Sequence, residues 1–194
     1  MKISTKIRFG TTLIVALVLA FFGADFFFTT QVRKATEKQV VVEKIVQGAF
    51  ELVLFRSQYV VLPEERFKMQ WVRVYEAQLK LFDESTPLFT KPAEKALFDE
   101  IHETLRSVQL LFKDLVLQVE RGGSKEVIER LAGQLSATNH GRIINALHLA
   151  ELIRKDSAVA ERAFRVALLL LGLLILAVTA GFYVISMTIT KSLL

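Results

Sequence analysis

The sequence predicts an all-α protein in which two transmembrane helices flank an antiparallel four-helix bundle. Two long apolar runs, residues 11–28 and 166–187, each approach the roughly 20 residues that a helix needs to cross about 30 Å of hydrocarbon. The segment between them, residues 29–165, is rich in charged side chains, and its apolar residues recur at helical rather than alternating spacing. Prolines and paired glycines divide this segment into four stretches, which suits an up-down-up-down bundle.

The four stretches are separated by residues that end helices. Proline lacks a backbone N–H, and a Gly-Gly pair is a strong stop signal. The breaks fall at Pro63, at Thr86-Pro87 and at Gly122-Gly123. The stretches therefore cover residues 29–62, 64–85, 92–121 and 124–165. No comparable break separates the first and fourth stretches from the neighbouring apolar runs, so we expect a continuous helix across each of these two junctions.

Each stretch carries an apolar seam suited to helix packing. The third stretch is the clearest, because its apolar residues are spaced alternately by four and three positions. These residues are Ile101, Leu105, Val108, Phe112, Leu115 and Val119. The first stretch repeats the pattern with Val42, Ile45, Ala49, Leu52 and Tyr59. Such seams predict that the four helices bury one face each in a common core.

Basic residues predict the orientation in a membrane. Lys2, Lys6 and Arg8 precede the first apolar run and Lys191 follows the second, so the positive-inside rule puts both termini in the cytoplasm. A bacterial inner-membrane protein with a periplasmic bundle is then expected. The first run could also be a cleaved signal peptide, but its long, Phe-rich core favours an uncleaved anchor.

The resulting division has five parts. We expect a cytoplasmic N-terminus at residues 1–10, transmembrane helices at 11–28 and 166–187, a periplasmic bundle at 29–165 and the start of a cytoplasmic linker at 188–194.

Composition argues against several functional classes. The net charge of the chain is +5, but in the segment between the two apolar runs acidic and basic residues are nearly equal in number. No nucleic-acid-binding face is therefore expected. The chain has no cysteine, which excludes disulfides and thiolate chemistry. His102, His140 and His148 lack the spacing of a metal site. We therefore expect no catalytic residue, metal or cofactor within this chain.

Polar residues at core-facing positions are the candidate functional residues. Arg56 continues the seam of the first stretch, and Arg142 and Asn145 continue that of the fourth. Because a buried charge needs a partner, each arginine should pair with an acid. Counting residues from the turns puts Arg56 level with Asp114, and Arg142 level with Glu43.

These arginines allow two interpretations. In the simpler interpretation, the two arginines fix helix register through the ion pairs Arg56–Asp114 and Glu43–Arg142. The alternative is that Arg56 or Arg142, with Asn145, receives a small anionic ligand.

The run Asn139-His140-Gly141 interrupts the fourth stretch with three poor helix formers. It is either a tolerated surface segment or a signalling hinge in the helix that continues into the second apolar run.

Two motifs resemble bacterial receptors. The tail Ile189-Thr190-Lys191-Ser192-Leu193 resembles the opening of a HAMP linker, although Ser192 stands where that family usually has proline. Residues 59–67 with Gln70-Trp71 resemble the first helical hairpin of sensor modules in two-component receptors. The resemblance implies the sensory part of a sensor histidine kinase or chemoreceptor. It further implies a homodimer and an output domain, most simply a histidine kinase, beyond Leu194.

Two functions of different classes are therefore expected to compete. A transmembrane receptor would contact the lipid bilayer and receive a small anionic ligand or a periplasmic binding protein. A non-catalytic adaptor would instead use its bundle to dock a partner protein. The receptor interpretation expects the reading frame to continue past Leu194 into an output domain, whereas the adaptor interpretation expects it to stop there.

Overall fold

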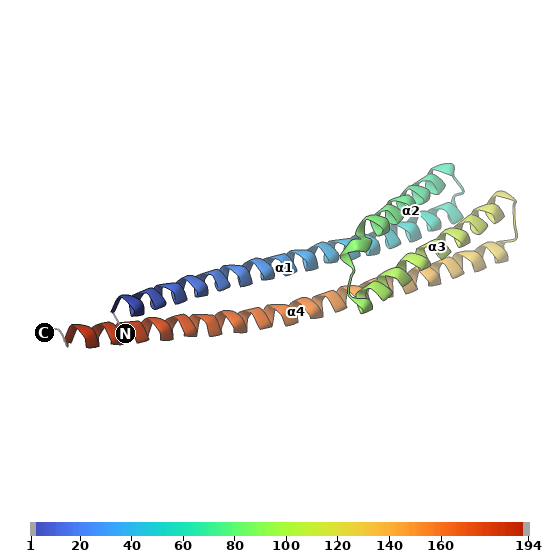
Figure 1. The fold of residues 1–194 in the computed structure, drawn as a ribbon. Helices are drawn as coiled ribbons and strands as arrows, with labels where there is room; N and C mark the ends of the chain where they lie inside the picture. The colour runs from blue at the N-terminus through green and yellow to red at the C-terminus, as the bar shows by residue number, and fades with distance from the viewer. Residues whose placement is uncertain (1–2, 192–194) are drawn as a thin grey trace. The chain divides into compact units, whose positions relative to one another are not determined.

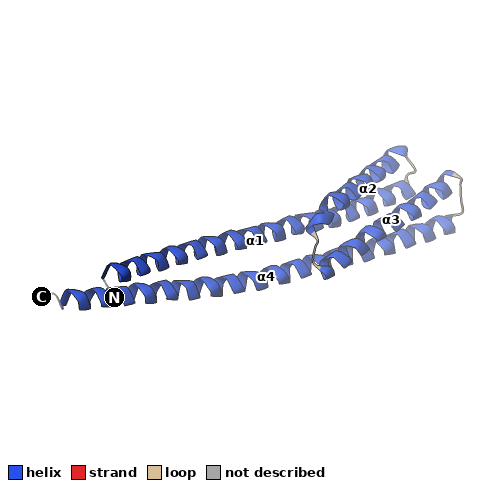
Figure 2. Ribbon diagram, viewed as in Figure 1, coloured by secondary structure: helices blue, strands red, loops and turns tan. Residues whose placement is uncertain are grey.

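The computed structural model describes residues 3–191, and in this part of the chain all regular structure is helical (Figure 2). The elements are α1 (Ile3–Val61), α2 (Glu65–Ser85), the short 3₁₀ helix η1 (Thr86–Leu88), α3 (Pro92–Glu120) and α4 (Lys125–Lys191). Their boundaries fall at the predicted breaks. The all-α fold with a four-helix bundle and two long apolar helices is confirmed.

The chain divides into two compact units. The bundle unit is residues 34–155, and the terminal unit combines residues 1–33 with residues 156–194. Helices α2 and α3 belong wholly to the bundle unit, whereas α1 and α4 each contribute to both units as single, uninterrupted helices (Figure 1). This continuity matches the expectation that no break separates the bundle helices from the apolar runs.

The turn between α3 and α4 follows from its two glycines. Gly122 has φ +68°, a left-handed conformation that glycine adopts without steric penalty. The Gly123 N–H donates to the Gln118 carbonyl at 2.8 Å, which satisfies a carbonyl at the end of α3. The Ser124 hydroxyl then accepts a bond from the Val127 N–H at 3.4 Å, as an N-cap of α4. Together these contacts reverse the chain within a few residues.

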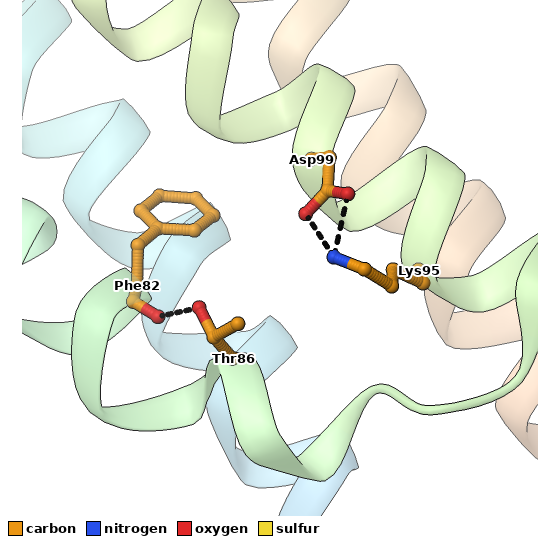
Figure 3. A network of polar contacts seen from close by, with 4 residues as sticks. All are labelled: Phe82, Thr86, Lys95 and Asp99. Carbon is orange, nitrogen blue, oxygen red and sulfur yellow. Dashed lines mark hydrogen bonds and ion pairs between the residues drawn. The ribbon is translucent and has the colours of Figure 1, made fainter.

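Local polar contacts support the connection between α2 and α3 (Figure 3). The Thr86 hydroxyl donates to the Phe82 carbonyl at 2.9 Å, at the end of α2. In the first turns of α3, the Lys95 ammonium pairs with Asp99 one turn later at 2.8 Å. Such exposed i,i+4 pairs contribute only about 0.3–0.5 kcal/mol each. They support the local helices, while the core supplies most of the stability.

The predicted seams form the core of the bundle unit. On α3 the five seam residues from Ile101 to Leu115 are each no more than 2 % exposed. On α1 the seam is also buried, from Val42 to Tyr59. An aromatic stack lies between α2 and α3, where the centroids of the Trp71 and Phe112 rings are 3.7 Å apart. Burial of these large rings is the main favourable term for the bundle.

The terminal unit has the opposite distribution of apolar side chains. Phe26 and Leu169 are 76 % and 69 % exposed, and among the residues of this unit whose burial is described no apolar face is covered in the way the bundle seams are. Phe28 and Phe164 stack with centroids 3.9 Å apart. By length and composition, α1 and α4 each contain a segment able to cross a membrane. The expected limits of the two spans remain predictions.

One close approach in the bundle unit depends on glycine. The buried Gln78 side chain on α2 lies against Gly48 on α1, and its amide donates to the Lys44 carbonyl at 2.9 Å. A Cβ at position 48 would lie 2.1 Å from Gln78 Nε2 and 2.9 Å from its Cγ. The glycine therefore allows α2 to place an amide over the backbone of α1.

Gly48→Ala should lower the free energy of unfolding by about 1–3 kcal/mol, because the new methyl group displaces the Gln78 amide from its buried hydrogen bond. The measurement is chemical unfolding of the full chain in detergent, followed by circular dichroism.

Gly133→Ala on α4 is the matched control, since a Cβ there meets nothing within 4 Å. It should raise stability by about 0.5–1 kcal/mol through helix propensity. A Gly48→Ala variant as stable as this control would contradict the packing argument.

Candidate functional site

Arg142 is the most unusual side chain of the bundle unit. It lies on α4 with 0 % exposure, and its Nε and both terminal nitrogens have no hydrogen-bond partner. Burial lowers the pKa of Arg142 to about 10, so the guanidinium still carries its charge at neutral pH. A buried charge without a partner is costly, and such groups occur preferentially where function requires them.

Two amides share the level of Arg142. Asn139 precedes it by one turn on α4 and donates from Nδ2 to the Ala49 carbonyl at 2.7 Å. Gln78 on α2 donates to the Lys44 carbonyl of the same α1 segment. Because α1 and α4 are antiparallel, Arg142 comes level with the part of α1 between these two contacts. We call Gln78, Asn139 and Arg142 the polar layer.

The polar layer contains both hydrogen-bond donors and hydrogen-bond acceptors that have no partner. Asn139 Oδ1 and Gln78 Oε1 are buried acceptors without a partner, and Arg142 offers donors. Each unsatisfied buried group costs about 1–3 kcal/mol. The unpartnered guanidinium has the donor chemistry that an anion needs, and the polar layer offers no nucleophile or general base. Among the described residues no three His, Asp or Glu side chains are grouped to hold a metal ion.

Neither predicted ion pair forms. Arg142 has no hydrogen-bond partner, and Glu43 lies on an exposed face of α1. Arg56 donates to the Ala132 carbonyl on α4 and to the Ser57 hydroxyl, while Asp114 is exposed on α3. Counting from the turns estimates the height of a residue along the bundle, but it does not determine which face of a helix that residue occupies.

The three candidate ligand residues do not converge on one point. Arg56 bonds to Ala132, which precedes Arg142 by ten residues on α4, or about 15 Å along the helix axis. Asn145 uses its amide to donate to Glu100 on α3 at 2.9 Å. Of the two arginines, Arg142 alone has its whole guanidinium unpartnered. The ligand role of Arg56 or Arg142, with Asn145, remains a prediction.

The predicted hinge does not interrupt the helix. α4 continues through residues 139–141, and Asn139 ties it to α1. His140 and Gly141 are exposed, and a Cβ at Gly141 would meet nothing within 4 Å. The segment is therefore bound to α1 on the Asn139 side and exposed on the side of His140 and Gly141. Its role as a hinge remains a prediction.

The sequence analysis missed a buried ion pair between α1 and α3. The Lys38 ammonium lies 2.5 Å from a Glu94 carboxylate oxygen, and both side chains are nearly covered. Lys38 also lies 5.8 Å from the centre of the Phe89 ring. Extending the α1 seam back by four residues from Val42 reaches Lys38, and extending the α3 seam back by seven from Ile101 reaches Glu94. That extrapolation would have found the pair.

Comparison with known proteins gives one informative likeness. No protein-family model and no curated protein matches the chain. A solved structure described as the periplasmic sensor domain of a sensor histidine kinase matches with a TM-score of 0.65 and 14 % sequence identity. The match covers 70 % of this chain and 94 % of that one. At this identity the likeness establishes a shared helical fold.

Arg142→Met should raise the free energy of unfolding by about 1–4 kcal/mol, because an apolar side chain of similar volume replaces a buried charge that has no partner. Unfolding of the full chain in detergent measures the change.

Arg130→Met, at an exposed position of the same helix, is the control and should alter stability by no more than about 0.5 kcal/mol. A clear loss of stability in Arg142→Met would show that the guanidinium makes net favourable contacts, contrary to this account.

Proposed function

We propose that this chain is the sensory part of a transmembrane receptor that detects a stimulus outside the cytoplasm. The observation that carries the proposal is the continuity of α4, a single helix from Lys125 in the bundle unit through an apolar segment to Lys191. The fold shared with the periplasmic sensor domain of a sensor histidine kinase supports the same function. A bundle with two such helices is suited to carry a change of helix position from one compartment to another.

The proposed location is the bacterial inner membrane. Both termini lie in the cytoplasm, where the basic residues before the first apolar run favour them, and the bundle lies in the periplasm. The exposure of apolar side chains such as Phe26 and Leu169, at 76 % and 69 %, supports burial of the terminal unit in lipid.

The proposed mechanism uses the two helices shared by both units. A stimulus favours one of two positions of α4 relative to α1, and the position of α4 sets the output. The contact between Asn139 and the Ala49 carbonyl lies at this interface and would differ between the two states. The ligand is a small anion bound at Arg142, or else a periplasmic binding protein conveys the stimulus.

The output is proposed to be a histidine kinase joined through a HAMP-like linker beginning near residue 188. Helix α4 includes Ile189 to Lys191, whereas Ser192, Leu193 and Leu194 lie outside the described residues. A homodimer is also proposed. In the bundle unit the apolar side chains of Phe50 and Leu54 on α1 and of Leu147 on α4 are each more than half exposed. These side chains offer apolar surface to a second copy of the chain.

A disulfide between α1 and α4 should fix the output. The chain lacks cysteine, so Ala49→Cys with Asn139→Cys introduces a single cross-link at an existing contact. Oxidation should change the basal activity of the full-length protein by about fivefold or more, the lower range of allosteric coupling, and a reductant should reverse the change. Kinase autophosphorylation in membranes measures it.

Lys68→Cys with Glu120→Cys, joined by a short bis-maleimide because the 2.9 Å contact is between the tips of long side chains, provides the control. It links α2 to α3, and neither helix leaves the bundle unit. This second cross-link should leave the activity within about twofold of the reduced protein. Unchanged output in a fully cross-linked α1–α4 variant would refute the mechanism.

A further inference from the structure

A groove between α2 and α3 lies apart from the polar layer. Its volume is about 450 Å³, within the range of sites for small organic molecules. Trp71, Tyr75 and Phe112 line it together with aliphatic side chains such as Val72 and Val116. The surface it offers is therefore mainly apolar.

The charged residues of the groove do not select strongly for one sign. Lys68 and Lys113 are opposed by Glu76 and Glu120, and Lys68 is already paired with Glu120 at 2.9 Å. The formal charges cancel. A bound molecule would be recognised by its apolar body and its hydrogen bonds rather than by its net charge.

Trp71, one of the lining residues, carries an unsatisfied donor. Trp71 is 2 % exposed, and its indole N–H has no hydrogen-bond partner. Two aromatic rings stack with its ring, with the Phe112 centroid at 3.7 Å and the Tyr75 centroid at 5.6 Å. A buried indole N–H normally finds an acceptor, and leaving it without one costs about 1–3 kcal/mol.

From these observations we infer that the α2–α3 groove binds a small aromatic molecule that carries a hydrogen-bond acceptor, such as an aromatic amide. The ring occupies the apolar part of the groove, and the acceptor oxygen bonds to the indole N–H of Trp71. Because the indole nitrogen is covered in the structure, binding requires a small shift of the aromatic stack. Ligand binding and the position of Trp71 are thereby coupled.

This inference concerns binding alone and stands whether or not the chain is a receptor. Trp71 is the sole tryptophan of the chain, so its indole N–H gives one resonance in a ¹⁵N-correlated NMR spectrum. The full chain, labelled with ¹⁵N-tryptophan in lipid nanodiscs, is titrated with benzamide. Benzylammonium, a ring of similar size without an acceptor, is the comparison probe. Because the formal charges of the groove cancel, charge alone would not favour benzylammonium.

Benzamide should move the indole proton downfield in a saturable manner, and benzylammonium should not. Val116→Phe fills the groove and should abolish the benzamide shift. Val74→Phe, at a half-buried position of α2 outside this groove, should preserve it. No saturable shift with benzamide, an equal shift with benzylammonium, or a shift that persists in a folded Val116→Phe variant would overturn the inference.

Discussion

The structure depends on one constraint, which is that α1 and α4 must each suit two environments along a single helix. Within the bundle unit each helix buries one seam, as Ile45 and Leu149 show with 0 % exposure. Within the apolar runs of the terminal unit the same helices expose large apolar side chains, such as Phe22 and Leu173. One-sided apolar seams suit a water-soluble bundle, and all-round apolar surfaces suit lipid. Because no break separates the two patterns, the helices physically connect the two units.

The polar groups inside the bundle unit fall into two kinds. Lys38 and Glu94 neutralise each other across α1 and α3. Arg142 has no such partner, although the amides of Asn139 and Gln78 reach α1 at the same level. A satisfied pair specifies how helices align, whereas an unsatisfied charge leaves the interior open to a second arrangement. In the proposed receptor, the polar layer is therefore the part of the bundle where the two states would differ most.

Local signals in the sequence sufficed for the elements but not for the site. Pro63 and Gly122-Gly123 end helices by backbone chemistry, and the α3 seam follows from helical period, so both were predictable. The partners of Arg56 and Arg142 depend on helix rotation, which a one-dimensional count cannot supply. Trp71 is buried in the core. Its unsatisfied indole N–H depends on the rings stacked on it, which only the folded arrangement shows.

The membrane arrangement is tested most directly by cysteine labelling in cells whose outer membrane has been made permeable and whose inner membrane is intact. The chain has no native cysteine, so Ser124→Cys in the α3–α4 turn and Ser4→Cys near the N-terminus each report one site. The account predicts that a membrane-impermeant maleimide labels Ser124→Cys in intact cells and Ser4→Cys only after lysis. Labelling of Ser124→Cys only after lysis would place the bundle in the cytoplasm and contradict the account.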